Sequence, residues 1–508
     1  MIDTKRPPRL LRRTLAIAVP LGLAACSLQP RYERPAQPVP NQYPGGPAYR
    51  GAPRASTPAG VTAADLGWQD FFKDPKLRRL IEIALKNNRD LRVATFSIEE
   101  ARAQYAIQRA AQFPSLSANA GAASSRLPST LRGGLPSHLD TFTAGVGLNP
   151  FEIDLFGRVR SLKDAALEQY LALTAVRRAV QISLVSEVAS AYLTLQADQA
   201  LLKLSQDTLE VQQQTVEMVK RGKSVGGMAE LDVHRAQTQL EAVRVGVEQY
   251  TRQVAQDRNA LSMLIGAPVP ANLLPPQAFG DATPVAELPA GLPSALLEQR
   301  PDIIAAEHRL KAANANIGAA RAAFFPSISL TGSVGVASAA LAGLFSSGLA
   351  WGVGAALSMP IFDGGANQGN LDAAKARKNI DIALYERTVQ QAFREVSDDL
   401  AARGTYDREA AAAQAQRQEI EDTRRLSEVR FRNGVDDYFP VFDAERQLYT
   451  VQQSLVTIRL ARLTSRVALY KALGGGWSRT TGAKDTVAQA DPDPVRTSSA
   501  PLARPVSH

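Results

Sequence analysis

Residues 325–330 read FPSISL, and residues 113–118, which lie 212 positions earlier, read FPSLSA. The same shift holds from residue 85 to residue 120, where 12 of 36 ungapped positions are identical. Further along, the shift becomes 208, so that Asp164 falls on Asp372 and Gly226 falls on Gly434. A register kept over this length indicates an internal duplication. We therefore expect two structurally similar halves that stack side by side.

Four segments alternate apolar residues with small polar residues, and this period of two is typical of strands that have two different faces. They cover about 113–126, 140–153, 325–337 and 348–361. Strand lengths near ten residues and a polar face fit a transmembrane barrel with a wet lumen. The strands alone leave a soluble sandwich open as the alternative. Since a closed barrel needs about eight strands, a barrel would require several copies of the chain.

Each half also contains a very long helical segment. Between Gly157 and Gly222 about 65 residues contain neither glycine nor proline. The counterpart, about 368–432, contains no proline and only two glycines, Gly369 at its start and Gly404 inside it. At 1.5 Å per residue such a helix would be roughly 100 Å long. Apolar residues recur every seventh position, which predicts coiled-coil packing, either in a channel wall or in a plain rod. The positions in the first half are Val188, Leu195, Leu202, Leu209 and Val216.

Each half thus reads helix, strand, strand, long helix, helix. Two glycine-containing turns join the long helices to their successors. They are residues 222–229, which read GKSVGGMA, and residues 433–440, which read NGVDDYFP. We expect these turns to be the tips of two helical hairpins.

The first 26 residues have the pattern of a targeting signal. Five Lys or Arg precede a short apolar run over 15–25, which is too short to span a bilayer, and the run ends in Leu-Ala-Ala before Cys26. This pattern predicts a lipoprotein signal peptide over 1–25 and acylation of Cys26, the single cysteine of the chain. A secretory signal with a coincidental cysteine is the alternative. Residues 26–75 are then an extended, lipid-anchored segment, and residues 478–508 a disordered tail.

Composition excludes several function classes. The chain has 508 residues, 45% of them apolar, and a formal charge of +9 that is too small and too dispersed to indicate nucleic-acid binding. One cysteine excludes an intrachain disulfide framework, and four scattered histidines contain no metal-binding pair. No catalytic triad or nucleotide-binding loop occurs. We therefore expect no enzyme, no metal and no cofactor other than the covalent lipid on Cys26.

Several segments together resemble the TolC-like outer-membrane efflux factors, most closely their lipoprotein branch. They are 68–75 (WQDFFKDP), 155–158 (LFGR), 292–307 (LPSALLEQRPDIIAAE), 323–332 (AFFPSISLTG), 360–365 (PIFDGG) and 432–446 (RNGVDDYFPVFDAER).

The resemblance implies an α+β membrane protein. In it, three copies build a twelve-stranded outer-membrane β-barrel that continues as a periplasmic α-helical barrel. It implies a periplasmic adaptor protein and an inner-membrane RND-type pump as partners. The repeats would be residues 76–275 and 276–477.

The second tip carries the candidate gate. In a trimer, Asp436 and Asp437 would form rings of carboxylates, and such a ring needs cations, protons or arginine partners. The resemblance implies an acidic constriction here, to which we assign Asp436 and Asp437, with Tyr438, Arg430 and Arg432 as partners. The alternative is a solvated turn with an aspartate helix cap. We expect the adaptor to contact the tips at the positions Gly222, Gly226, Gly227, Gly434 and Val435.

The sequence hypothesis is therefore a passive trimeric conduit that exports small molecules, such as drugs or other toxic compounds, across the outer membrane. Two alternatives remain: a lipid-anchored structural or adhesive trimer, and a protein-secretion channel. The sequence does not identify the exported compounds.

Overall fold

The computed structural model describes residues 28–50, 63–126, 128, 138–276, 279, 285–286, 288, 294–346 and 348–482. The predicted signal peptide, Cys26 and residues 483–508 of the predicted tail lie outside these ranges. The described residues form two compact units. Unit 1 draws on residues up to Asn41, on Arg89–Val180 and on Leu297–Arg394; unit 2 draws on Gln42–Asn88, on Gln181–Leu296 and on residues from Glu395 onward.

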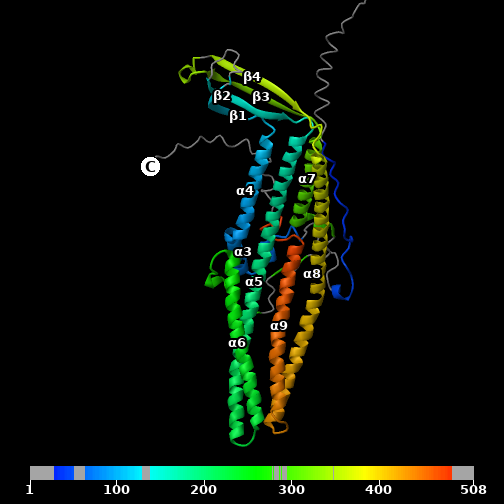
Figure 1. Ribbon diagram of the computed structural model, residues 1–508. Coiled ribbons are helices and arrows are strands. Elements are labelled where there is room, and N and C mark those ends of the chain that lie inside the picture. Colours follow the sequence, from blue (N-terminus) through cyan, green and yellow to red (C-terminus); the bar gives the residue numbers. More distant parts are fainter. Residues whose placement is uncertain are drawn as a thin grey trace, which may run out of the picture. The chain divides into compact units, whose positions relative to one another are not determined.

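Both halves of the chain have the same order of elements (Figure 1). The first half contains α4 (Arg89–Ala110), β1 (Leu116–Arg126), β2 (His138–Ile153), α5 (Arg158–Ser224) and α6 (Glu230–Ile265). The second half contains α7 (Pro301–Ala322), β3 (Ser327–Ser338), β4 (Leu349–Ser358), α8 (Ala366–Arg432) and α9 (Phe439–Ala472). The matching long helices α5 and α8 have 67 residues each. This is the order that the sequence predicts for each half.

The two units cut across the predicted repeats, because each half contributes to both. All four strands belong to unit 1 and both hairpin tips belong to unit 2. The repeat boundaries, residues 76–275 and 276–477, therefore stay a prediction about the duplication. The two compact units of the structure have other boundaries, because each unit combines residues from both repeats.

The four strands of unit 1 form one curved antiparallel sheet in the order β1-β2-β3-β4 (Figure 1). Apolar residues pair across strands on one face, where Val146 lies opposite both Ala118 and Val334. β1 and β3 begin just after Pro114 and Pro326, slightly later than the alternation predicts, since proline cannot donate a ladder hydrogen bond. The register between β2 and β3 shifts between Leu148 and Phe151, which the sequence did not predict.

Two glycines allow β2 and β3 to approach closely at the centre of the sheet. Gly145 and Gly335 lie directly opposite each other. A Cβ atom on Gly335 would be 2.4 Å from the carbonyl oxygen of Ala144, and one on Gly145 would be 2.7 Å from that of Val334. These contacts are too short for any side chain. The small residues on the face that carries Gly145 and Gly335 therefore permit the curvature of the sheet.

Unit 2 is built from helices that pack through the predicted apolar seam. Val188, Leu195 and Val216 of α5 are buried, as the heptad pattern predicts. The short helices α2 (Trp68–Phe71) and α3 (Pro75–Asn87) lie against this bundle. Phe71 stacks on Tyr470 of α9 with ring centroids 4.0 Å apart. None of the described helices combines the length and the apolarity needed to cross a bilayer.

Residues 28–46, within the predicted extended segment 26–75, contain no helix or strand and are held by side chains of the helices. The prediction is wrong for Trp68–Phe71, which form helix α2 because Trp68 and Phe71 are buried against the bundle. In unit 1, the guanidinium of Arg34 donates to Glu307 of α7 at 2.7 Å, and Asn314 donates to the carbonyl of Pro30 at 2.7 Å. In unit 2, Arg408 of α8 donates to the carbonyls of Arg50 and Pro47. These bonds fix a segment that has few apolar contacts of its own.

Candidate functional site

The two hairpin tips have the same backbone conformation. Gly226 and Gly434 adopt φ values of +78° and +68°, in the left-handed region that favours glycine. In each tip the next residue closes a six-residue turn: Gly227 N–H donates to Gly222 O at 2.9 Å, and Val435 N–H donates to Arg430 O at 3.0 Å. Both are glycine-based helix C-caps. The duplication therefore extends to the backbone hydrogen bonds of the tips.

The tip residues that we expect to contact an adaptor are mostly accessible. Gly226, Gly227 and Gly434 are exposed, and the Val435 side chain is 60% exposed. Gly222 is partly covered, because a Cβ atom there would lie 2.9 Å from Met228 Sδ. The backbone and Val435 are thus free to meet a partner, whereas Gly222 also has a packing role.

The two candidate gate carboxylates have different local partners. Asp436 forms a two-pronged ion pair with Arg430, with Nε to Oδ2 at 2.5 Å and Nη2 to Oδ1 at 2.8 Å. This hydrogen-bonded guanidinium lowers the pKa of Asp436 below its ordinary value. Asp437 instead accepts the N–H of Phe439 at 3.1 Å, at the start of α9. Asp436 is therefore neutralised within its own chain. Asp437 bonds the backbone at the first residue of α9 but is not its N-cap, which is Tyr438.

Two predicted partners of the gate have other contacts. Arg432 pairs with Glu428 one turn earlier on α8, not with either aspartate, because an i,i+4 contact on a helix face is nearer than the turn. Tyr438 is 6% exposed and packs inward, where its apolar ring contributes more to stability than a surface contact would. The expected pairing of these two residues with the carboxylates is corrected accordingly, and their part in a gate stays a prediction.

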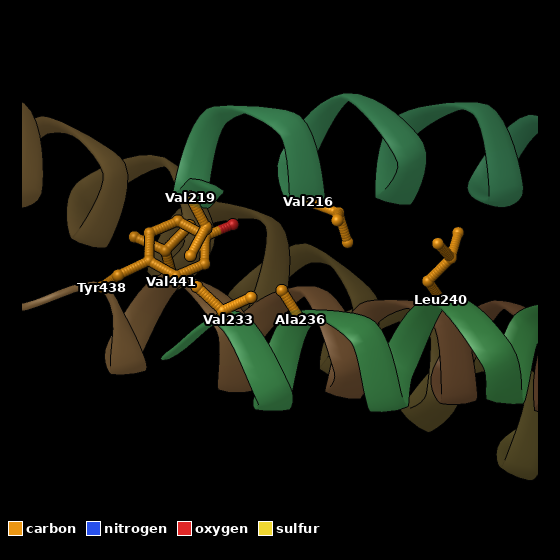
Figure 2. Packing of buried hydrophobic residues seen from close by; sticks show 7 residues of the cluster. All are labelled: Val216, Val219, Val233, Ala236, Leu240, Tyr438 and Val441. Atoms are coloured by element: carbon orange, nitrogen blue, oxygen red, sulfur yellow. The ribbon is translucent and has the colours of Figure 1, made fainter. Parts of the chain in front are cut away.

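Tyr438 belongs to a buried apolar group, the tip cluster, that joins both hairpins (Figure 2). Its buried members are Val216, Val219, Val233, Ala236, Leu240, Tyr438 and Val441. The side chains come from α5 and α6 on one hairpin and from the start of α9 on the other. Figure 2 shows the Tyr438 ring beside Val219 and Val441. Separating the two hairpins would expose this cluster to water, so it favours hairpins that stay in contact at their tips.

Polar residues behind the tip cluster also connect the hairpins, and the sequence analysis missed them. Gln212 of α5 donates to Glu445 Oε2 of α9 at 3.2 Å. The Tyr438 hydroxyl is within hydrogen-bonding distance of Thr215 and Glu445, and burial raises the pKa of Glu445. In addition, the Arg235 guanidinium of α6 lies 5.0 Å from the centroid of the Phe439 ring. The sequence does not reveal these contacts because the partners are far apart in the chain, and each residue alone is an ordinary helical residue.

The chain is similar to known proteins over most of its length. A model of the outer membrane efflux protein family matches residues 80–267 and 292–475. The antibiotic efflux pump outer membrane protein ArpC of Pseudomonas putida is 48% identical over 462 residues, which cover 91% of this chain and 94% of ArpC. The toluene efflux pump outer membrane protein TtgC of Pseudomonas putida has the same identity and coverage. The crystal structure of the open state of the Neisseria gonorrhoeae MtrE outer membrane channel aligns with a TM-score of 0.80. It is 38% identical and covers 90% of this chain and 100% of that one.

Proposed function

The chain belongs to the outer membrane efflux protein family, and from this premise we propose that three copies form one twelve-stranded barrel through which small molecules leave the cell. The protein is an outer-membrane channel of an efflux pump, and its role is transport, not catalysis. The relatives support this function over a structural or adhesive trimer and over protein secretion.

The observation that carries the proposal is the incomplete sheet of unit 1. Among the described residues, β1 and β4 each pair with one strand only, so each has a free edge. Free edges are templates for pairing with another chain. Pairing β4 of one copy with β1 of the next closes a barrel, and three copies supply twelve strands. Two copies would supply eight, so the number of subunits is the quantity to measure.

The faces of the sheet also fit a barrel in the outer membrane. Large apolar side chains on β4 are exposed, with Trp351 75%, Val353 79% and Leu357 69% accessible. Lipid would cover them in a barrel. The opposite face is rich in glycine and serine, and small residues at Gly145 and Gly335 suit a concave, water-filled interior. Trp351 and Phe142 are our candidates for an aromatic belt at the membrane interface.

We further propose that a partner provides the energy. The channel is passive, a periplasmic adaptor protein contacts the exposed tips, and an inner-membrane RND-type pump drives export. The relatives are named as parts of efflux pumps, which supports the need for such partners. Acylation of Cys26 would anchor each copy to the outer membrane as a second attachment besides the barrel.

The names of the relatives also suggest a substrate class. ArpC is named for antibiotics and TtgC for toluene. We propose that this channel likewise carries small organic toxicants. The test is complementation: a strain that lacks this chain should accumulate toluene and antibiotics, and the chain should restore export. Restored export of neither class would contradict the substrate proposal.

The second tip is our candidate for the gate. The Asp436→Ala, Asp437→Ala double variant should leave the trimer intact and leak more ions in a planar bilayer. Equal conductance at equal insertion would refute the gate assignment without touching the channel assignment.

A further inference from the structure

A pair of aspartates lies between α5 and α6 in unit 2, in a part of the hairpin where neither the gate nor the channel assignment needs a charge. Asp198 of α5 faces Asp257 of α6, and the two carboxyl groups are within hydrogen-bonding distance. Asp257 is only 9% exposed. Two carboxylates at this distance repel each other, and burial adds a desolvation cost to each charge.

The hydrogen bonds of Asp257 account for one of its oxygens only. Its Oδ1 accepts from Gln253 at 3.3 Å. Its Oδ2 is fully buried and has no hydrogen-bond donor among the described residues. A buried carboxylate oxygen without a donor is costly, and such an oxygen is rare in folded proteins. A proton shared with Asp198 would supply the missing donor and remove the repulsion at the same time.

In the described part of the chain, the charge that acts on Asp198 is that of Asp257, and no cation offsets it. Tyr250 of α6 interacts electrostatically with Asp198 and with Tyr449 of α9. Tyr449 is itself hydrogen-bonded to Ser205 of α5 at 2.8 Å. These phenols carry no charge near neutral pH. The next lysine along α5, Lys203, is paired with Asp207 at 2.6 Å.

We propose that Asp198 and Asp257 form a proton-binding site that couples the packing of α5 against α6 to the pH of the surrounding medium. Desolvation, followed by the hydrogen bond and the charge of Asp257, raises the pKa of Asp198 to about 7. Because the pKa of a carboxyl is raised on folding, the stabilisation is present at acidic pH and is lost as the pH rises through about 7. The hairpin is therefore held more tightly in acid than in alkali.

A proton suits this site better than a metal ion does. Divalent cations in proteins take six or more oxygen ligands, or a tetrahedral set with histidine or cysteine. Among the described residues no group of three or more His, Cys, Asp or Glu could hold a metal ion. A chelator should therefore leave the site unchanged.

The experiment is hydrogen exchange by mass spectrometry on the full chain, with peptides that cover 190–206 and 250–264. After correction for the intrinsic exchange rate, protection should fall by up to about tenfold per pH unit between pH 5 and pH 7 and level off above. Asp257→Asn should abolish this slope, because the amide donates to Asp198 and lets it ionise normally. Asp207→Asn, on the exposed face of α5, is the matched control and should keep the slope.

Three results would overturn the proposal. They are protection that does not depend on pH in the wild-type chain, a slope that persists in Asp257→Asn, and protection that changes when EDTA or Ca²⁺ is added at constant pH. The last would assign the pair to a cation. None of these outcomes bears on the channel, which is measured separately by conductance.

Discussion

Replacing Tyr438 by alanine tests whether the tip cluster keeps the channel closed. The ring is 6% exposed and contacts side chains of both hairpins. Truncating a buried aromatic residue to alanine costs about 3–5 kcal/mol, since the apolar contacts are lost and a cavity remains. If the channel is closed only while the two hairpins are in contact, the substitution destabilises the closed state and leaves the free energy of the open state unchanged. A difference of 3 kcal/mol then changes the ratio of open to closed tips by more than about 100-fold.

The assay is the open fraction of single channels in a planar bilayer, with the subunit number measured on the same sample. Tyr438→Phe is the matched control. It keeps the ring and removes only the hydroxyl, while Gln212 still donates to Glu445. We expect the alanine variant to be open most of the time and the phenylalanine variant to behave nearly as the wild type does.

An alanine variant that assembles normally and stays closed would refute the reasoning, because the tip cluster would then contribute nothing to closure. If that variant does not assemble, Val219→Ala replaces it. Val219 is fully buried in the same cluster, and removing two methyl groups costs about 1.5–2 kcal/mol. An open fraction that Val219→Ala leaves unchanged would refute the reasoning equally.

Three further predictions concern charge, backbone and curvature. Arg430→Ala frees the carboxylate of Asp436 and returns its pKa towards the ordinary value. The second tip of each copy then has two uncompensated carboxylates instead of one, and the cation-to-anion permeability ratio should rise, most clearly at low salt; an unchanged ratio would place Asp436 outside the pore. Asp437→Ala removes the acceptor of the Phe439 N–H and should destabilise the first turn of α9 by about 1 kcal/mol, seen as faster hydrogen exchange there; equal exchange would show that this hydrogen bond is dispensable. Gly335→Ala places a Cβ atom against the backbone of β2, so it should cost about 1–3 kcal/mol and reduce the yield of assembled trimer. Gly121→Ala, whose Cβ atom meets only a hydroxyl at 3.5 Å, should leave that yield unchanged. Equal yields for both would contradict the close approach of the strands.

The sequence predicts the order of elements well because the signals are periodic and occur twice. A period of two identifies all four strands. The absence of proline and the near absence of glycine identify both long helices, since α5 contains no glycine before Gly222 and α8 contains only Gly369 and Gly404. The ends of β1 and β3 differ by a few residues because the prediction ignored the missing N–H of Pro114 and Pro326. The register shift in β2 was not predictable, since it depends on how β2 pairs with β3 and not on its own pattern.

The candidate site was predicted less completely. The sequence points to Asp436 and Asp437 as a charged pair on a turn, but not to their different partners. Arg430 and Arg432 look equivalent in the sequence, and only the direction of each side chain from α8 decides that one reaches Asp436 and the other Glu428. The burial of Tyr438 depends on contacts with a hairpin about 200 residues away, which no local pattern reports.

The most direct test of the account is to measure the mass and the conductance of the purified, full-length protein in one sample. We predict a trimer with a low, mostly closed and cation-favouring conductance, which Tyr438→Ala converts to a larger and more persistent one. A monomer, or a trimer with no conductance at any voltage or salt concentration, would contradict the assignment of the chain as a gated efflux channel.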